Sequence, residues 1–204
     1  MNQRIFSRRR RRVRCNVLDI EASGLGSDSY PIEVGVVMAS GREYQALIKP
    51  APEWKHWCKE AEAMHGINCE ALETYGLSVH DVCAELNDFC RGETLYSDCW
   101  TRDLPWILTL FGQAGVYPAF KCSPIEMVLK EHQLSDWTQH KSKIIEATGL
   151  RSHRALNDAR IIAKTMNMLL GQAQISRPAS VEAEAESASV TRDTVRQHSV
   201  DRVA

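Results

Sequence analysis

In the first part of the chain, apolar residues either alternate with polar ones or form continuous runs, as is typical of β-strands. Residues 13–22 are mostly apolar and β-branched, which predicts a buried central strand. After a turn rich in glycine, residues 32–38 and 43–48 predict two more strands, with Ser40 and Gly41 as the hairpin turn between them. Three consecutive strands with short connections predict an antiparallel meander.

Beyond Pro52 the apolar positions recur every three to four residues, which predicts helices. One helix is expected at residues 59–64. A longer one is expected at 78–90, where Ser78 caps the N-terminus and an apolar stripe faces the core. The later elements alternate strands and helices: a strand at 93–96, a helix at 104–114 with Pro105 in its first turn, a strand at 120–122 and a helix at 155–170.

These elements predict an α/β fold with a mixed five-stranded sheet, in which strands 1–3 form the meander and parallel strands follow. The length of 204 residues fits one domain, placed at residues 13–170. Residues 1–12 are expected to be a disordered basic arm because of the run Arg8 to Arg12, and residues 171–204 a disordered polar tail. The arm has two interpretations: non-specific phosphate binding, or a solvated extension that precedes the true start of translation.

Composition narrows the class of protein. A formal net charge of -1 gives no overall attraction to nucleic acid, so any basic contact surface must be local. The seven cysteines are an odd number without a C-x-x-C pair, so we expect reduced thiols. No stretch approaches the roughly 18 to 20 continuous apolar residues of a membrane-spanning helix. We therefore expect a soluble, cytoplasmic protein.

Two carboxylates, Asp19 and Glu21, lie two residues apart on the first predicted strand. Side chains alternate between the faces of a strand, so both point to one face while Leu18 and Ile20 point to the other. One interpretation is a solvated edge strand. The apolar surroundings favour another: buried carboxylates must be paired or bind metal. Several carboxylates converging from distant elements are what a two-magnesium site for phosphodiester hydrolysis requires.

A second group of polar residues opens the last predicted helix. His153 lies just outside it or in its first turn, and Asp158 projects from the turn that follows. An aspartate here can bind a metal ion, while a histidine with a pKa near neutrality can take a proton from an attacking water. A lone histidine near a helix start is more often structural, so its role depends on the carboxylates around it.

Together, DIEASGL at 19–25 and HRALNDA at 153–159 resemble the DEDDh 3′→5′ exonucleases. That superfamily includes ribonuclease T, oligoribonuclease and the proofreading subunit of bacterial DNA polymerase III. Two segments in between, PIEVGVV at 31–37 and MHGIN at 64–68, resemble it as well. The resemblance covers roughly residues 13–170 and implies a ribonuclease H-like fold.

The second motif of that family supplies one more aspartate at the start of a helix, and YSDCWTRDLPWIL offers Asp98 and Asp103. We favour Asp103, because the apolar residues that follow it resemble those of the family. Asp98 and Cys99 then stand where many members have histidine and asparagine, so this motif departs from the pattern. Asp98 remains the alternative ligand.

Carried over residue by residue, the resemblance implies two Mg²⁺ ions, or Mn²⁺, held by Asp19, Glu21, Asp103 and Asp158, with His153 as the general base. It also implies that Ala22, Ser23, Gly24 and Leu25 cradle the terminal nucleotide, with Leu25 wedged against a base. Trp100 either stacks on a base or packs in the protein, whereas the spacing of Trp106 favours the core.

The implied activity is release of nucleoside monophosphates from the 3′ ends of single-stranded DNA or RNA. DNA is slightly favoured, because residues 102–105 resemble the corresponding stretch of the animal DNA-trimming exonucleases. The alternative is a catalytically weak or inactive nucleic-acid-binding module on the same fold. The family also makes a homodimer plausible. We expect a structural role for His65, packing roles for Trp54 and Trp57, and solvated helix faces for the charged residues of 126–143.

Overall fold

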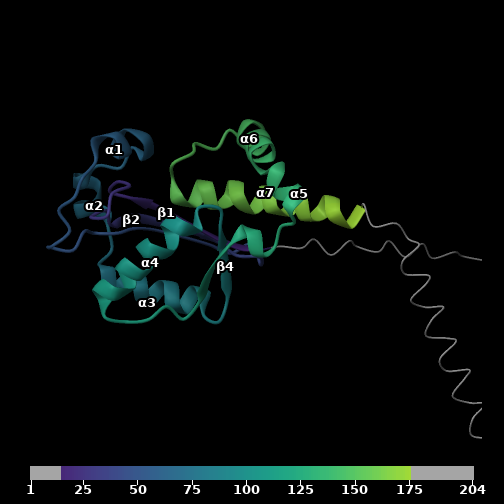
Figure 1. Ribbon diagram of the computed structural model, residues 1–204. Helices are drawn as coiled ribbons and strands as arrows, with labels where there is room; N and C mark the ends of the chain where they lie inside the picture. The colour runs from purple at the N-terminus through teal and green to yellow at the C-terminus, as the bar shows by residue number, and fades with distance from the viewer. Residues whose placement is uncertain (1–14, 176–204) are drawn as a thin grey trace, which may run out of the picture. The chain divides into compact units, whose positions relative to one another are not determined.

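The computed structural model describes residues 15–175 and, for residues 172–175, the backbone alone. Its centre is a five-stranded sheet in the order β3-β2-β1-β4-β5 (Figure 1). The strands are β1 (Asn16–Ala22), β2 (Pro31–Val37), β3 (Glu43–Leu47), β4 (Thr94–Ser97) and β5 (Lys121–Pro124). The predicted basic arm and most of the predicted tail lie outside the described residues.

The strand directions confirm the predicted sheet. β1, β2 and β3 pair antiparallel, whereas β4 joins β1 and β5 joins β4 in parallel. The turn between β2 and β3 is the predicted one: Gly41 has a φ of 93°, a left-handed conformation that favours glycine, and its N–H donates to the Met38 carbonyl. Only residues 16 and 17 of β1 pair with β4, so the second half of β1 has an open edge on that side.

Seven α-helices and one 3-10 turn complete the described part of the chain. They are α1 (Lys59–His65), α2 (Cys69–Tyr75), α3 (Val79–Cys90), α4 (Trp100–Ala114), the 3-10 turn Ile125–Met127, α5 (Glu131–Ser135), α6 (Trp137–Thr148) and α7 (Ala155–Ile175). The Ser78 hydroxyl caps α3 as predicted, accepting the N–H of Asp81.

The predicted start of α4 was wrong by four residues. The helix begins at Trp100 because the Cys99 carbonyl accepts the N–H groups of both Arg102 and Asp103, which extends the helix toward its N-terminus. Pro105 therefore lies past the first turn. At the other end of the chain, α7 continues to Ile175, five residues beyond the expected end of the last helix.

The helices cover the two faces of the sheet differently. Leu18 and Ile20 of β1 belong to the core cluster that α3 and α4 complete, so the opposite face of β1 carries Asp19 and Glu21. Figure 1 shows α7 on the side of the sheet away from α3 and α4. β2 and the start of α7 approach closely at Gly35, where an added Cβ would lie 2.3 Å from the Ala155 carbonyl carbon. The first turn of α7 is thereby brought next to β1 and β2.

Candidate active site

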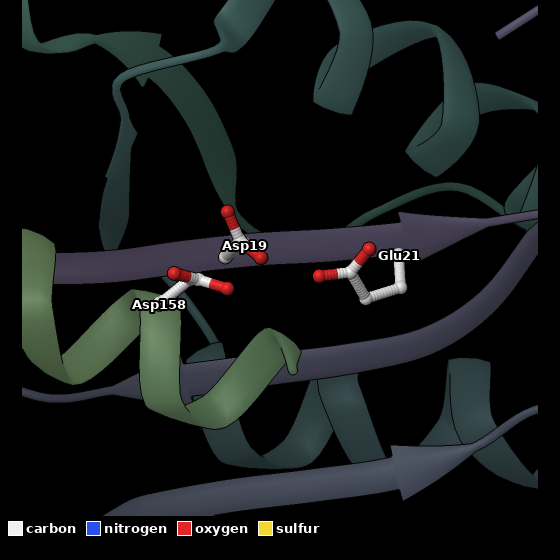
Figure 2. Close-up of side chains that lie close together, drawn as sticks. All are labelled: Asp19, Glu21 and Asp158. Atoms are coloured by element: carbon white, nitrogen blue, oxygen red, sulfur yellow. The ribbon is translucent and has the colours of Figure 1, made fainter. Parts of the chain in front are cut away.

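Three carboxylates from two distant segments meet on the α7 side of β1. Asp19, Glu21 and Asp158 each place an oxygen within 4.8 Å of the others. Figure 2 shows the Asp158 side chain reaching from α7 toward the two β1 carboxylates. The period of two along β1 directs Asp19 and Glu21 to this face, and the close packing at Gly35 brings α7 above them. The predicted convergence of Asp158 with the β1 pair is confirmed.

Asp103 reaches the same site from the open edge of β1. Its carboxylate accepts hydrogen bonds from the Ser97 hydroxyl and from the backbone N–H of Ile20, the residue between Asp19 and Glu21. It is 1% exposed. Its oxygens lie outside the tightest cluster of described acidic groups, yet its charge acts on both β1 carboxylates. The structure therefore places the favoured second-motif aspartate beside the other three.

Repulsion and burial shift every carboxyl group in this site in the same direction. Burial, followed by the charges of Asp103, Asp158 and Glu21, raises the pKa of Asp19 well above its usual value. Burial and the charge of Asp158 raise the pKa of Glu21 to about 8, and burial raises that of Asp103 to about 7 although Ser97 opposes the shift. Such a donor set is costly without cations and suits hard divalent ions, which bind carboxylate oxygens.

Stability of the metal-free protein should consequently fall as pH rises. The pKa of Glu21 goes from 4.5 to about 8 on folding, so the folded state holds a proton that the unfolded state has lost. The stabilisation is complete below about pH 4.5 and is lost through about pH 8, with a limiting slope of about 1.4 kcal/mol per pH unit for each such proton. Urea unfolding in EDTA across this range measures the slope.

Two controls show whether the pH dependence of stability comes from the acidic site. Glu21→Gln should flatten the pH dependence, because it removes one of the titrating groups. Excess Mg²⁺ should weaken or reverse it, since a bound cation favours the ionised carboxylates. A metal-free wild-type protein whose stability holds constant or rises across the same range would contradict the electrostatics described above.

An ion pair between a buried carboxylate, Glu33, and the partly exposed Arg154 anchors the segment that carries His153 and Asp158. Glu33 of β2, with no exposed surface, accepts hydrogen bonds from Arg154 (Nη2 at 2.6 Å), from the Ala155 N–H at 2.9 Å and from the Gln45 amide at 2.7 Å. It thereby satisfies an N–H at the first turn of α7 and neutralises its own charge. Sequence reasoning missed this pair, although an acidic residue inside the apolar run PIEVGVV is a signal for a buried partner.

His153 lies immediately before this anchor in an unusual conformation. Its φ is 62°, the one positive φ at a non-glycine residue in the described chain. Histidine is among the residue types that adopt this region more readily than most. The backbone N–H groups of His153 and Arg154 both donate to the Asp158 carboxylate, and the imidazole is exposed. The predicted general base therefore lies next to the cluster and is open to solvent.

Asp98, the alternative second-motif ligand, is already occupied by protein donors. Its Oδ2 lies 2.6 Å from Lys141 Nζ and also accepts the Trp137 indole N–H at 3.3 Å. The prediction that the charged residues of 126–143 lie on solvated helix faces was wrong for Lys141, whose side chain is 28% exposed. Although burial lowers the pKa of Lys141, the charges of Asp98, Asp19 and Asp158 raise it on balance, so this cation lies within reach of the site. Asp103 is the better candidate ligand.

The segment predicted to cradle a nucleotide follows β1 directly. Ala22, Ser23 and Gly24 are buried, and the Ser23 hydroxyl accepts the Tyr30 N–H, whereas Leu25 is 68% exposed. At Gly24 a Cβ would lie 2.5 Å from the His56 ring, so the loop is packed tightly from behind. Within this segment it is therefore the Leu25 side chain that faces outward.

The side chains of the tryptophans and of His65 mainly pack against other residues or form hydrogen bonds within the protein. The Trp100 indole N–H donates to the Cys122 carbonyl at 3.0 Å, which leaves its ring face for any stacking. Trp106 packs on the core, Trp54 stacks on Tyr30 and Trp57 donates to Glu62, as packing roles require. His65 is buried, and its Nδ1 accepts the Ile67 N–H at 3.0 Å.

All seven cysteines lie in the described part of the chain and are free thiols. Among the helices of residues 15–175, none has the length and apolar character needed to cross a bilayer.

No family model and no curated protein matches this sequence. Solved structures do resemble the fold at low sequence identity. E. coli exonuclease I in complex with a 5cy-dT13 oligonucleotide superposes with a TM-score of 0.57 at 12% identity, over 75% of this chain and 40% of that chain. Exonuclease I from Methylocaldum szegediense superposes with a TM-score of 0.61 at 14% identity, over 79% of this chain and 41% of that chain.

A zinc-bound complex of E. coli exonuclease I with single-stranded DNA gives a TM-score of 0.56 at 12% identity, over 80% of this chain and 42% of that chain. The chain thus spans about two fifths of the length of these exonucleases. The likeness confirms the predicted ribonuclease H-like fold and the resemblance to exonucleases at the level of fold.

Proposed function

We propose that this protein is a metal-dependent 3′→5′ exonuclease that releases nucleoside monophosphates from single-stranded DNA or RNA ends. The observation that carries the proposal is the convergence of Asp19, Glu21 and Asp158 within 4.8 Å, with Asp103 beside them. No structural purpose accounts for grouping four carboxylates whose pKa values are all raised, because their mutual repulsion destabilises the fold. Binding of cations does account for it.

The four carboxylates would hold two Mg²⁺ or Mn²⁺ ions. When bound, such ions supply an activated water and neutralise charge on the leaving oxygen. The backbone N–H groups of His153 and Arg154 orient the Asp158 carboxylate, and the Ser97 hydroxyl and Ile20 N–H orient that of Asp103. The exposed imidazole of His153 takes the proton of the attacking water.

The terminal nucleotide would lie along residues 22–25, which run directly from the metal-binding strand. Leu25, exposed over 68% of its surface, is the side chain placed to wedge against a base. The ring face of Trp100 offers a second apolar surface for stacking. Single-stranded DNA is the favoured substrate, because E. coli exonuclease I has the same fold and forms complexes with a DNA oligonucleotide and with single-stranded DNA.

The direct test uses 5′-labelled single-stranded DNA, the same sequence as RNA, and a DNA duplex, each with Mg²⁺ and with EDTA. We expect a ladder that shortens from the 3′ end in Mg²⁺ and no product in EDTA, with faster turnover of the single-stranded DNA. A ladder from a 3′-labelled strand that retreats from the 5′ end would contradict the polarity. Binding without product on every substrate would instead favour the nucleic-acid-binding module.

A further inference from the structure

A small pocket lies beside the nucleotide-binding loop, on the side where α4 begins. Its volume is about 210 Å³, and its walls come from the loop after β1 (Leu25, Gly26, Ser27) and from α4 (Arg102, Pro105, Trp106). It is smaller than the roughly 300 to 1,000 Å³ of typical drug-sized ligand sites. A group the size of one phosphate with part of its sugar fits it better than a whole nucleotide.

The chemistry of the pocket suits an anion. Arg102 is the one charged residue among its described lining residues, and four residues with hydroxyl groups line it as well: Ser27, Ser29, Thr101 and Thr109. Thr101 and Arg102 stand in the first turn of α4, whose N-terminus receives no side-chain cap from the described residues. Backbone N–H groups at the N-terminus of a helix attract negative charge, and an arginine adds a full charge with several donors.

One hydrogen bond and one peptide bond join the pocket to the candidate active site. Arg102 Nη1 donates to the Leu25 carbonyl at 2.9 Å, which holds the guanidinium next to the exposed wedge residue. Arg102 also directly precedes Asp103, whose carboxylate lies in the site. One wall of the pocket is therefore the Leu25 loop, and the other is the helix that carries the second-motif aspartate.

Resting on the exonuclease activity proposed above, we propose that this pocket binds a phosphodiester of the strand upstream of the 3′-terminal nucleotide, with Arg102 as its cation. A base wedged by Leu25 would separate the terminal nucleotide from the next one, and the pocket is where the strand then continues. The overall charge of -1 supplies no general attraction, so a local cation at this position matters for holding the strand.

The test compares Arg102→Ala, Arg102→Lys and the control Arg91→Ala, an exposed arginine on the far end of α3 paired with Asp88. Each is assayed on pentathymidylate and on thymidine 5′-(p-nitrophenyl phosphate), which has no upstream nucleotide. For Arg102→Ala the loss of kcat/KM should be about tenfold greater on pentathymidylate than on the ester, through KM. Arg91→Ala should match wild type on both substrates.

Binding of fluorescein-labelled pentathymidylate in Ca²⁺, followed by anisotropy across salt concentrations, gives a readout independent of turnover. The slope of log affinity against log salt should fall by about 0.7 in Arg102→Ala and be largely kept in Arg102→Lys, because one phosphate contact is lost or retained. Equal losses on both substrates, or an unchanged slope in Arg102→Ala, would overturn the pocket proposal. A wild type that binds with the full slope but hydrolyses neither substrate would overturn the exonuclease proposal alone.

Discussion

Asp19→Asn is expected to stabilise the metal-free protein while removing nearly all of its nuclease activity. Burial and the charges of four neighbouring carboxylates raise the pKa of Asp19, so either ionising or protonating it at neutral pH costs folding free energy that a neutral amide avoids. We expect a gain of about 1 kcal/mol or more in urea unfolding in EDTA. Losing a metal ligand should lower kcat by about 10³-fold, equivalent to about 4 kcal/mol of barrier.

The opposite signs of these two effects distinguish a metal ligand from a structural residue, which would lose stability and activity together. The matched control is Asp88→Asn on α3, whose exposed carboxylate pairs with Arg91 at the surface. It should leave both quantities close to wild type. Excess Mg²⁺ should stabilise the wild type and have little effect on Asp19→Asn. An Asp19→Asn variant that is less stable in EDTA, or one that keeps its activity, would show that the carboxylates serve another purpose.

Glu33→Gln should be the most destabilising single substitution near the site, by about 3 kcal/mol in urea unfolding. The change leaves the Arg154 guanidinium without its counter-charge. It also replaces one of the two accepting oxygens by an NH2 group, so the Arg154 and Ala155 donors cannot both keep their acceptors. Because Arg154 and Ala155 connect His153 to α7, the variant should also lose activity even under conditions in which it is folded. Mg²⁺-dependent hydrolysis below the unfolding transition measures that loss.

A second ion pair between α7 and the sheet supplies the control for this prediction. Glu43 of β3 pairs with Arg160, and its side chain is 36% exposed, whereas that of Glu33 has no exposed surface. The two arginines are about equally exposed, at 35% and 34%. Glu43→Gln should therefore cost less than about 1 kcal/mol. In addition, Arg154→Met combined with Glu33→Gln should cost less than the sum of the single changes. Equal costs for Glu33→Gln and Glu43→Gln would contradict the anchoring role of the pair between Glu33 and Arg154.

Local sequence patterns were sufficient to predict much of this fold. The alternation in NVLDIEA predicted that Asp19 and Glu21 share one face of β1, and the structure has Leu18 and Ile20 packed on the other. The glycine at position 41 and the serine at position 78 predicted a hairpin turn and a helix cap from the chemistry of single residues. Such features depend on residues that lie a few positions apart in the chain, so they can be predicted from the sequence.

Contacts between distant segments were harder to predict. Lys141 looks like any solvated helical lysine, because nothing near it in the chain indicates that Asp98 lies 2.6 Å away. Likewise, the choice between Asp98 and Asp103 depended on the open edge of β1, which exists because β4 pairs only with the first two residues of that strand. The Arg102 pocket arises from the same long-range packing of α4 on the loop after β1.

Anomalous diffraction from crystals of the protein grown with Mn²⁺ would test the central claim most directly. The account predicts two manganese peaks among the carboxylates of Asp19, Glu21, Asp103 and Asp158, both lost on soaking in EDTA. Crystals in which these four side chains hold no metal at saturating Mn²⁺, and are neutralised instead by Lys141 or by protons, would contradict it.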